Sequence, residues 1–129
     1  MHDFGAVRVR FGRGEVTLDE LVEGWASRVL KVRADMNERD SSGSAWGIDD
    51  LVGSYYLRQA LQDGIAASPG VAVPRTLEAI DRLLESFTRD ESLTPIRKID
   101  AGIPDGWWWH RIPTRGPVRD EFDRLARAV

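Results

Sequence analysis

The residues of this chain that are best suited to binding or catalysis form one run, Trp107-Trp108-Trp109-His110-Arg111. Tryptophan and arginine dominate the residues that contribute most to protein–protein binding. We expect the run to be extended, so that Trp107 and Trp109 share one face and Trp108 occupies the other. A small domain can bury one such face more easily than both. The run is therefore a candidate partner-binding surface, and burial of all three indoles between helices is the alternative.

A second interpretation places a small-molecule site at the same run. Its polar groups would be His110 and Arg111, joined by Tyr55 and Asp50 from a predicted helix. This interpretation requires a concave pocket that holds His110 near a carboxylate. Asp49, Asp50 and Tyr55 are also candidate partner contacts, although the helix dipole alone explains the two acids in a first helical turn.

Motifs for other chemistries are missing from the sequence. It has only two histidines, no cysteine, no Gly-x-Ser-x-Gly elbow, no phosphate-binding loop and no His-Glu-x-x-His. The pairs Glu20/Glu23 and Glu78/Asp81 resemble helical Mg²⁺ ligands, but their expected solvent-facing positions favour an ordinary helix surface. We therefore predict no catalytic residue, no metal site and no cofactor.

Length and composition favour one globular domain. The chain has 129 residues, of which 42% are hydrophobic and 30% charged. This composition excludes global disorder, and no apolar run approaches the ~20 residues that cross a bilayer. The first residues lack a basic-then-apolar signal pattern. We predict a single domain over 1–129 and a cytoplasmic location, with no membrane association.

The charge is mildly negative and uneven. The net charge is −3 and the pI is about 5.4. Such a balance disfavours nucleic acid, which requires a basic face. Residues 44–90 carry seven acidic and four basic side chains, so the middle of the chain is its acidic part. An acidic patch attracts a basic partner, although the excess charge also serves solubility alone.

Hydrophobic spacing predicts a mainly α domain that positions these residues. Apolar side chains recur at intervals of three and four along most of the chain. The spacing predicts about four helices, over 17–36, 48–66, 75–88 and 117–128. The second helix has apolar residues on more than one face, so we expect it to be the central and most buried one.

The first helix carries the clearest signals. Thr17 and Glu20 form a capping-box pattern, in which each side chain accepts a hydrogen bond from the backbone of the other residue. The third helix offers a Glu78–Arg82 pair one turn apart. The apolar stripe of the first helix comprises Leu18, Leu21, Val22, Trp25, Val29 and Leu30.

Short extended segments complete the predicted architecture. Residues 5–11 end in period-two alternation and are followed by a turn at 12–14. Aromatic residues between glycine and proline favour a second extended segment at 107–112. The two segments are candidates to pair with each other. Between the first two helices, residues 37–47 are polar and rich in glycine and serine, which predicts a mobile loop.

Residues 105–117, which contain Gly106-Trp107-Trp108-Trp109-His110-Arg111-Ile112-Pro113, carry a family resemblance. In a small, acidic, arginine-rich helical chain, this segment resembles small bacterial immunity-type (antitoxin-like) proteins. The resemblance implies a binding protein that blocks a toxin's active site. We therefore predict a non-catalytic protein-interaction module, an immunity-type cognate inhibitor in its most specific form. A small enzyme or ligand-binding domain, and a homodimer joined through the tryptophans, are the alternatives.

Overall fold

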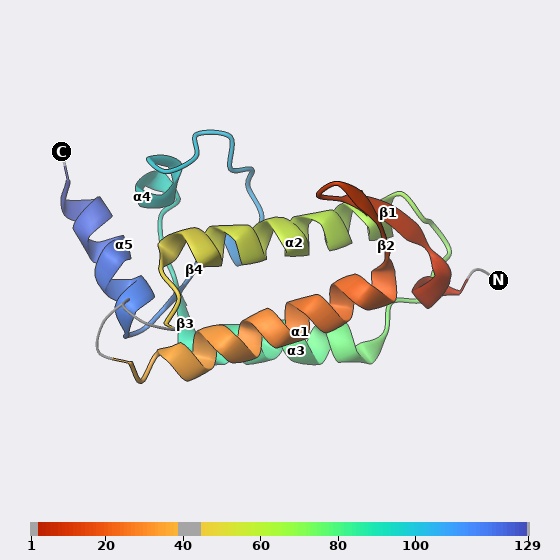
Figure 1. The fold of residues 1–129 in the computed structure, drawn as a ribbon, viewed down its shortest axis with the longest axis horizontal. Helices are drawn as coiled ribbons and strands as arrows, with labels where there is room; N and C mark the ends of the chain where they lie inside the picture. Colours follow the sequence, from red (N-terminus) through yellow and green to blue (C-terminus); the bar gives the residue numbers. More distant parts are fainter. Residues whose placement is uncertain (1–2, 39–44, 129) are drawn as a thin grey trace.

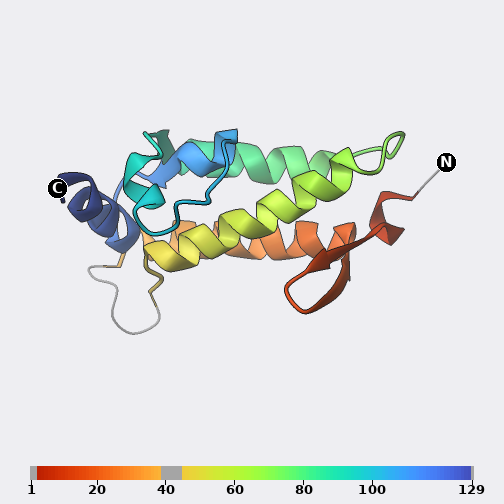
Figure 2. The same cartoon turned by 90° about the horizontal axis from the view of Figure 1, so that it is seen from above.

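Three long helices form the body of the molecule. The computed structural model describes residues 3–38 and 45–128. Helix α1 (Leu18–Asp35) packs against both α2 (Ile48–Ala66) and α3 (Arg75–Phe87), and the three lie alongside one another (Figures 1 and 2). Helix α5 (Pro117–Arg127) packs at one end of this body, against α2 and the short helix α4 (Thr94–Arg97). The prediction of a mainly α fold is confirmed.

Local sequence signals explain where the long helices begin. The Thr17 hydroxyl accepts a hydrogen bond from the Glu20 amide at 3.1 Å, and Glu20 accepts one from the Thr17 amide at 3.1 Å. The predicted capping box is therefore present. Every apolar residue predicted for the first stripe is buried except Leu30, whose side chain is 47% exposed. Helix α2 buries residues on more than one face, as predicted, and these include the polar Ser54 and Arg58.

The two small sheets pair differently from the prediction. Strand β1 (Arg8–Phe11) forms an antiparallel hairpin with β2 (Gly14–Thr17), and β3 (Thr88–Asp90) pairs with β4 (Arg111–Pro113). The suggested pairing of 5–11 with 107–112 is therefore wrong. The tight turn at 12–13, where Gly12 has a φ of 64°, lets β1 pair with its nearest neighbour at little entropic cost. Residues 4–6 form a 3₁₀ turn, η1 (Phe4–Ala6), instead of extended chain.

The tryptophan run is helical, which corrects the prediction of an extended segment. Residues Trp107–His110 form a 3₁₀ helix, η2, in which the Trp109 amide donates to the Gly106 carbonyl at 3.1 Å. A strand would send successive indoles to opposite faces, whereas this turn lets the adjacent Trp108 and Trp109 both enter the core. Of the predicted segment 107–112, only Arg111 and Ile112 lie in a strand.

The predicted mobile loop at 37–47 falls mostly on 39–44, which lie outside the described residues. The described residues on either side are fixed by polar contacts. The buried Asp35 carboxylate accepts from the Trp46 amide at 2.8 Å and from Lys31 at 2.9 Å. Arg115 donates to the Asn37 side chain at 3.0 Å, which ties the end of α1 to the segment before α5.

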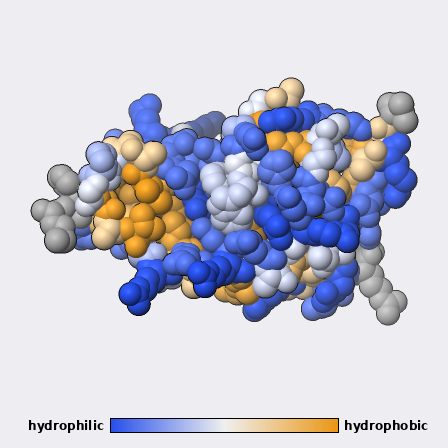
Figure 3. Space-filling view, turned by 180° about the vertical axis from the view of Figure 1, so that it is seen from behind, coloured by the Kyte–Doolittle hydropathy of each residue, from blue (hydrophilic) through white to orange (hydrophobic). Residues whose placement is uncertain are grey.

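The hydrophobic core is one contiguous cluster that draws on the long helices, η2 and β4. Trp25, Tyr55 and Trp109 are its largest fully buried side chains. In the described part of the chain, no helix is both long and apolar enough to span a bilayer. The rear face is largely hydrophilic, with an apolar patch towards the N-terminal end (Figure 3). The α2–α3 connection, which carries the exposed Val73, lies at that end.

Candidate functional site

The three tryptophans have different environments. Trp107 is 39% exposed, whereas Trp108 and Trp109 are 4% and 0% exposed. The indole N–H of Trp108 donates to the Tyr55 carbonyl at 3.2 Å, and that of Trp109 donates to the Gln59 side chain at 3.0 Å. Within the described residues, the Trp107 indole N–H has no hydrogen-bond partner. Trp107 is therefore the member of the run that is available to a ligand.

Trp108, Trp109 and Tyr55 were predicted as partner contacts, but they lie in the core. The Arg58 guanidinium lies over the Trp108 ring at 4.8 Å, and Tyr55 meets the Trp109 ring edge-on at 5.9 Å. Tyr55 is fully buried, and burial raises the pKa of its hydroxyl. That hydroxyl donates to the Arg111 carbonyl at 2.5 Å. Its hydrogen-bond partner therefore lies inside the protein and not at the surface.

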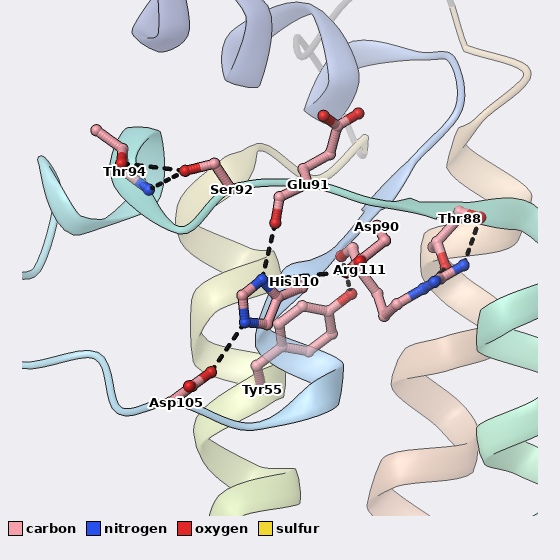
Figure 4. Close-up of polar contacts among 9 residues, drawn as sticks. All are labelled: Tyr55, Thr88, Asp90, Glu91, Ser92, Thr94, Asp105, His110 and Arg111. Carbon is pink, nitrogen blue, oxygen red and sulfur yellow. Dashed lines mark hydrogen bonds and ion pairs between the residues drawn. The ribbon is translucent and has the colours of Figure 1, made fainter.

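His110 joins two segments of the chain through both ring nitrogens (Figure 4). Its Nε2 lies 2.9 Å from a carboxylate oxygen of Asp105, and its Nδ1 lies 2.8 Å from the Glu91 carbonyl oxygen. Hydrogen bonding to Asp105 is the main cause that raises the pKa of His110 above its ordinary value. The same bond lowers the pKa of Asp105.

This geometry favours the doubly protonated ring. The Glu91 carbonyl oxygen can only accept, so Nδ1 must carry a proton. A neutral ring would then point the lone pair of Nε2 at the Asp105 carboxylate, whereas an imidazolium donates there. Neither nitrogen is left to exchange a proton with a substrate. The His110–Asp105 pair acts as a clasp between η2 and the segment that precedes it.

Arg111 is likewise committed to the protein. Its Nη2 donates to the carbonyl oxygens of Glu85 and Thr88 at 3.2 and 2.8 Å, and its Nε donates to the Thr88 hydroxyl at 3.0 Å. Glu85 lies in the last turn of α3 and Thr88 is the C-cap residue that follows it. At this end the helix leaves its last oxygens unpaired and its dipole is negative. Arg111 therefore caps α3 instead of projecting as a free cation.

A surface hollow of about 480 Å³ lies beside these groups, lined by Glu85, Asp90, Trp107, His110 and Arg111. The Glu85 carboxylate has no hydrogen-bond partner among the described residues. The Asp90 carboxylate is 76% exposed and lies 4.0 Å from His110 Nδ1. The lining groups without a hydrogen bond to the described residues are the Trp107 indole N–H, the Glu85 and Asp90 carboxylates, and Nη1 of Arg111.

The sequence predicted only some of the residues that line this hollow. Trp107, His110 and Arg111 lie side by side as predicted, and His110 does lie near a carboxylate in a concave site. That carboxylate is Asp105 and not the proposed Asp50. Asp105 is only five residues before His110, so proximity in sequence was the available signal. Glu85 and Asp90 reach the hollow through β3–β4 pairing, which the prediction lacked.

Asp49 and Asp50 lie elsewhere, in the first turn of α2. Asp50 accepts from the Gly47 amide at 3.0 Å, which supports the structural explanation for this residue. Asp49 borders a second hollow of about 460 Å³ at the end of the molecule where α2, α4 and α5 meet. This hollow is lined by Ile48, Asp49, Ile99, Glu121, Arg124, Leu125 and Ala128.

Glu78 and Asp81, which resembled helical Mg²⁺ ligands, each bind a different arginine. The predicted Glu78–Arg82 pair is present, at 2.6 Å. Asp81 is not solvent-facing as expected, because its oxygens accept from Arg58 at 2.9 Å and from the Trp25 indole at 2.9 Å. Over residues 3–38 and 45–128, no three histidine or carboxylate side chains converge as a metal site would require.

No family model matches this chain, and comparison with curated proteins and with solved structures finds no similar protein.

Proposed function

We propose that this protein is a non-catalytic interaction module that binds a basic partner protein through the hollow beside Trp107. The main support is the Trp107 indole, which is partly exposed and whose N–H has no partner among the described residues. It lies beside the Glu85 and Asp90 carboxylates, which form no strong bond within the protein. Exposed tryptophan in a concavity is typical of residues that anchor protein interfaces. Acidic groups around it complement a basic surface and accelerate encounter with it.

The hydrogen bonds that His110 and Arg111 form within the protein support a binding role over a catalytic one. A general base needs a nitrogen within hydrogen-bond reach of the substrate proton, and both nitrogens of His110 face protein oxygens. The Arg111 donors Nε and Nη2 are bonded to the end of α3. The hollow thus supplies contact area and charge more readily than proton transfer.

Magnitudes indicate that the hollow is one anchor of a larger interface. A cation on an exposed indole contributes about 0.5–1 kcal/mol, and an exposed ion pair about 0.2–1 kcal/mol. One indole and two carboxylates then give roughly 1–3 kcal/mol, whereas a micromolar complex needs about 8 kcal/mol. A partner must therefore contact surface beyond the hollow, in the manner of a specific protein complex.

More specifically, we propose an immunity-type inhibitor, the class of protein that the segment 105–117 resembles. Such a protein would act in the bacterial cytoplasm and would cover the active site of a toxin. The acidic character of residues 44–90 supports a basic partner of this kind.

Affinity capture with matched variants tests the proposal. The tagged protein is incubated with lysate of its native host, and co-eluting proteins are identified and quantified by mass spectrometry. We expect one stoichiometric basic protein, lost with Trp107→Ala and retained with Leu30→Ala. Leu30 is a suitable control because it is another exposed large apolar residue, 47% exposed on α1. An empty eluate, or equal capture by Trp107→Ala, contradicts the proposal.

A small-molecule site is the second candidate. The observation that favours it is the 2.9 Å His110–Asp105 contact at the edge of the hollow. If this candidate is correct, a ligand screen will yield a compound whose binding is abolished by His110→Gln and unaffected by Leu30→Ala.

A further inference from the structure

We propose that the hollow beside Trp107 receives the guanidinium group of an arginine side chain. This inference rests on the proposed function and names the chemistry that the partner presents. A guanidinium is planar and weakly hydrated, so it can lie on an indole face while its N–H groups donate to carboxylates. Trp107, Glu85 and Asp90 supply these two kinds of contact in one concavity.

The charges that line the hollow must still favour a cation, because His110 and Arg111 are positive. Their charges are countered locally. The Asp105 carboxylate pairs with His110 at 2.9 Å, and the carbonyl oxygens at the negative end of α3 accept from Arg111. Glu85 and Asp90 then remain as the carboxylates exposed to a ligand, and a cation entering the hollow meets net negative charge.

The same contacts disfavour an anion. A phosphate or carboxylate ligand needs free N–H donors. Both nitrogens of His110 and the Arg111 donors Nε and Nη2 are already engaged with protein oxygens. The donors that remain on the lining, the Trp107 indole N–H and Arg111 Nη1, share the hollow with Glu85 and Asp90, whose negative charges repel an anion. A lysine ammonium would be attracted by the same carboxylates, but it is strongly hydrated and cannot stack as a plane. We therefore expect arginine to bind more tightly than lysine.

Indole N–H signals in two-dimensional ¹H–¹⁵N NMR test this inference on the intact protein. The Trp107 signal is assigned by its loss in Trp107→Phe. The probes are N-acetylarginine amide, N-acetyllysine amide, N-acetylcitrulline amide as the neutral isostere, and inorganic phosphate. We expect the arginine probe to shift the Trp107 signal saturably, with a Kd on the order of 10 mM at low salt. The lysine probe should bind several-fold more weakly and the citrulline probe should cause no shift.

Charge-neutralising variants locate the site. Glu85→Gln and Asp90→Asn should each weaken arginine binding about two- to five-fold, because each removes one exposed ion pair. Glu23→Gln is the matched control, since Glu23 is an exposed carboxylate on α1 and does not line the hollow. It should leave the Kd unchanged.

The outcomes separate this inference from the proposed function. A Trp107 shift with phosphate and none with arginine overturns the guanidinium assignment, as does an equal response to citrulline. No shift with any probe also overturns it, even if the partner captured through Trp107 stands. If arginine binds here but capture is unaffected by Trp107→Ala, the hollow is a cation site and the proposed function fails.

Discussion

Neighbouring tryptophans of one run have unlike roles, and single substitutions should separate them. Trp108 is buried, donates to the Tyr55 carbonyl and lies under the Arg58 guanidinium. Trp108→Ala removes this packing, so it should lower the free energy of unfolding by about 3–5 kcal/mol in urea denaturation. Trp107→Ala should lower it by less than about 1 kcal/mol, because that ring is partly exposed. Equal losses would mean that the two rings are buried alike.

The residues of the candidate site could be predicted only in part. Residue type and adjacency sufficed to single out Trp107, His110 and Arg111. The carboxylates Glu85 and Asp90 belong to α3 and β3, and only the pairing of β3 with β4 brings them to the hollow. The prediction therefore placed acids of α2 at the site, whereas the acids that line the hollow come from other elements.

At the scale of elements, the approach of α5 to the end of α1 depends on a glycine. Gly116 has a φ of 97°, and a Cβ there would lie 2.8 Å from the Met36 Cα. Gly70 has a φ of 86° but would place its Cβ in open space. Gly70→Ala should therefore cost only the backbone strain, about 1–2 kcal/mol, in urea denaturation. Gly116→Ala should cost at least about 1 kcal/mol more, because backbone must move. Equal costs would contradict this close packing.

Elements governed by local signals matched their predictions closely. Capping residues and apolar spacing placed α1, α2, α3 and α5 almost to the residue. The pairing of the strands differed from the prediction, because tertiary structure determines which strands lie side by side. The run at 107–110 differed for the same reason: its aromatic composition favours a strand, but burial of two adjacent indoles requires a turn of 3₁₀ helix.

At the scale of the whole molecule, His110 makes stability depend on pH. Asp105, and then the Glu91 carbonyl, raise the pKa of His110 in the folded chain above its usual value of about 6.5. The folded state thus keeps the proton to higher pH than the unfolded chain. The resulting stabilisation is complete below about pH 6.5 and is lost as the pH rises through the folded-state pKa.

We therefore expect the free energy of unfolding from urea denaturation to fall between about pH 6 and pH 9. The fall should be steeper in the wild type than in His110→Gln, which keeps a polar side chain but does not titrate. The comparison with the variant also cancels the contribution of other groups that titrate in this range. Parallel curves for the two proteins would show that the clasp does not hold a proton.

Closely packed aromatic rings give the molecule an optical signature of its own. Trp25 meets Tyr55 at 6.0 Å, and Trp109 meets Tyr55 at 5.9 Å and Tyr56 at 4.8 Å, all edge-on. Rings held so close in fixed, asymmetric orientations produce near-ultraviolet circular dichroism, which disappears when side-chain packing loosens even if helices persist. That signal would report the order of the interior, while the emission of the partly exposed Trp107 would respond to its surroundings at the surface. The circular dichroism signal thus reports the integrity of the core. The difference in emission between the wild type and Trp107→Phe reports on the hollow, because the other four tryptophans emit in both proteins.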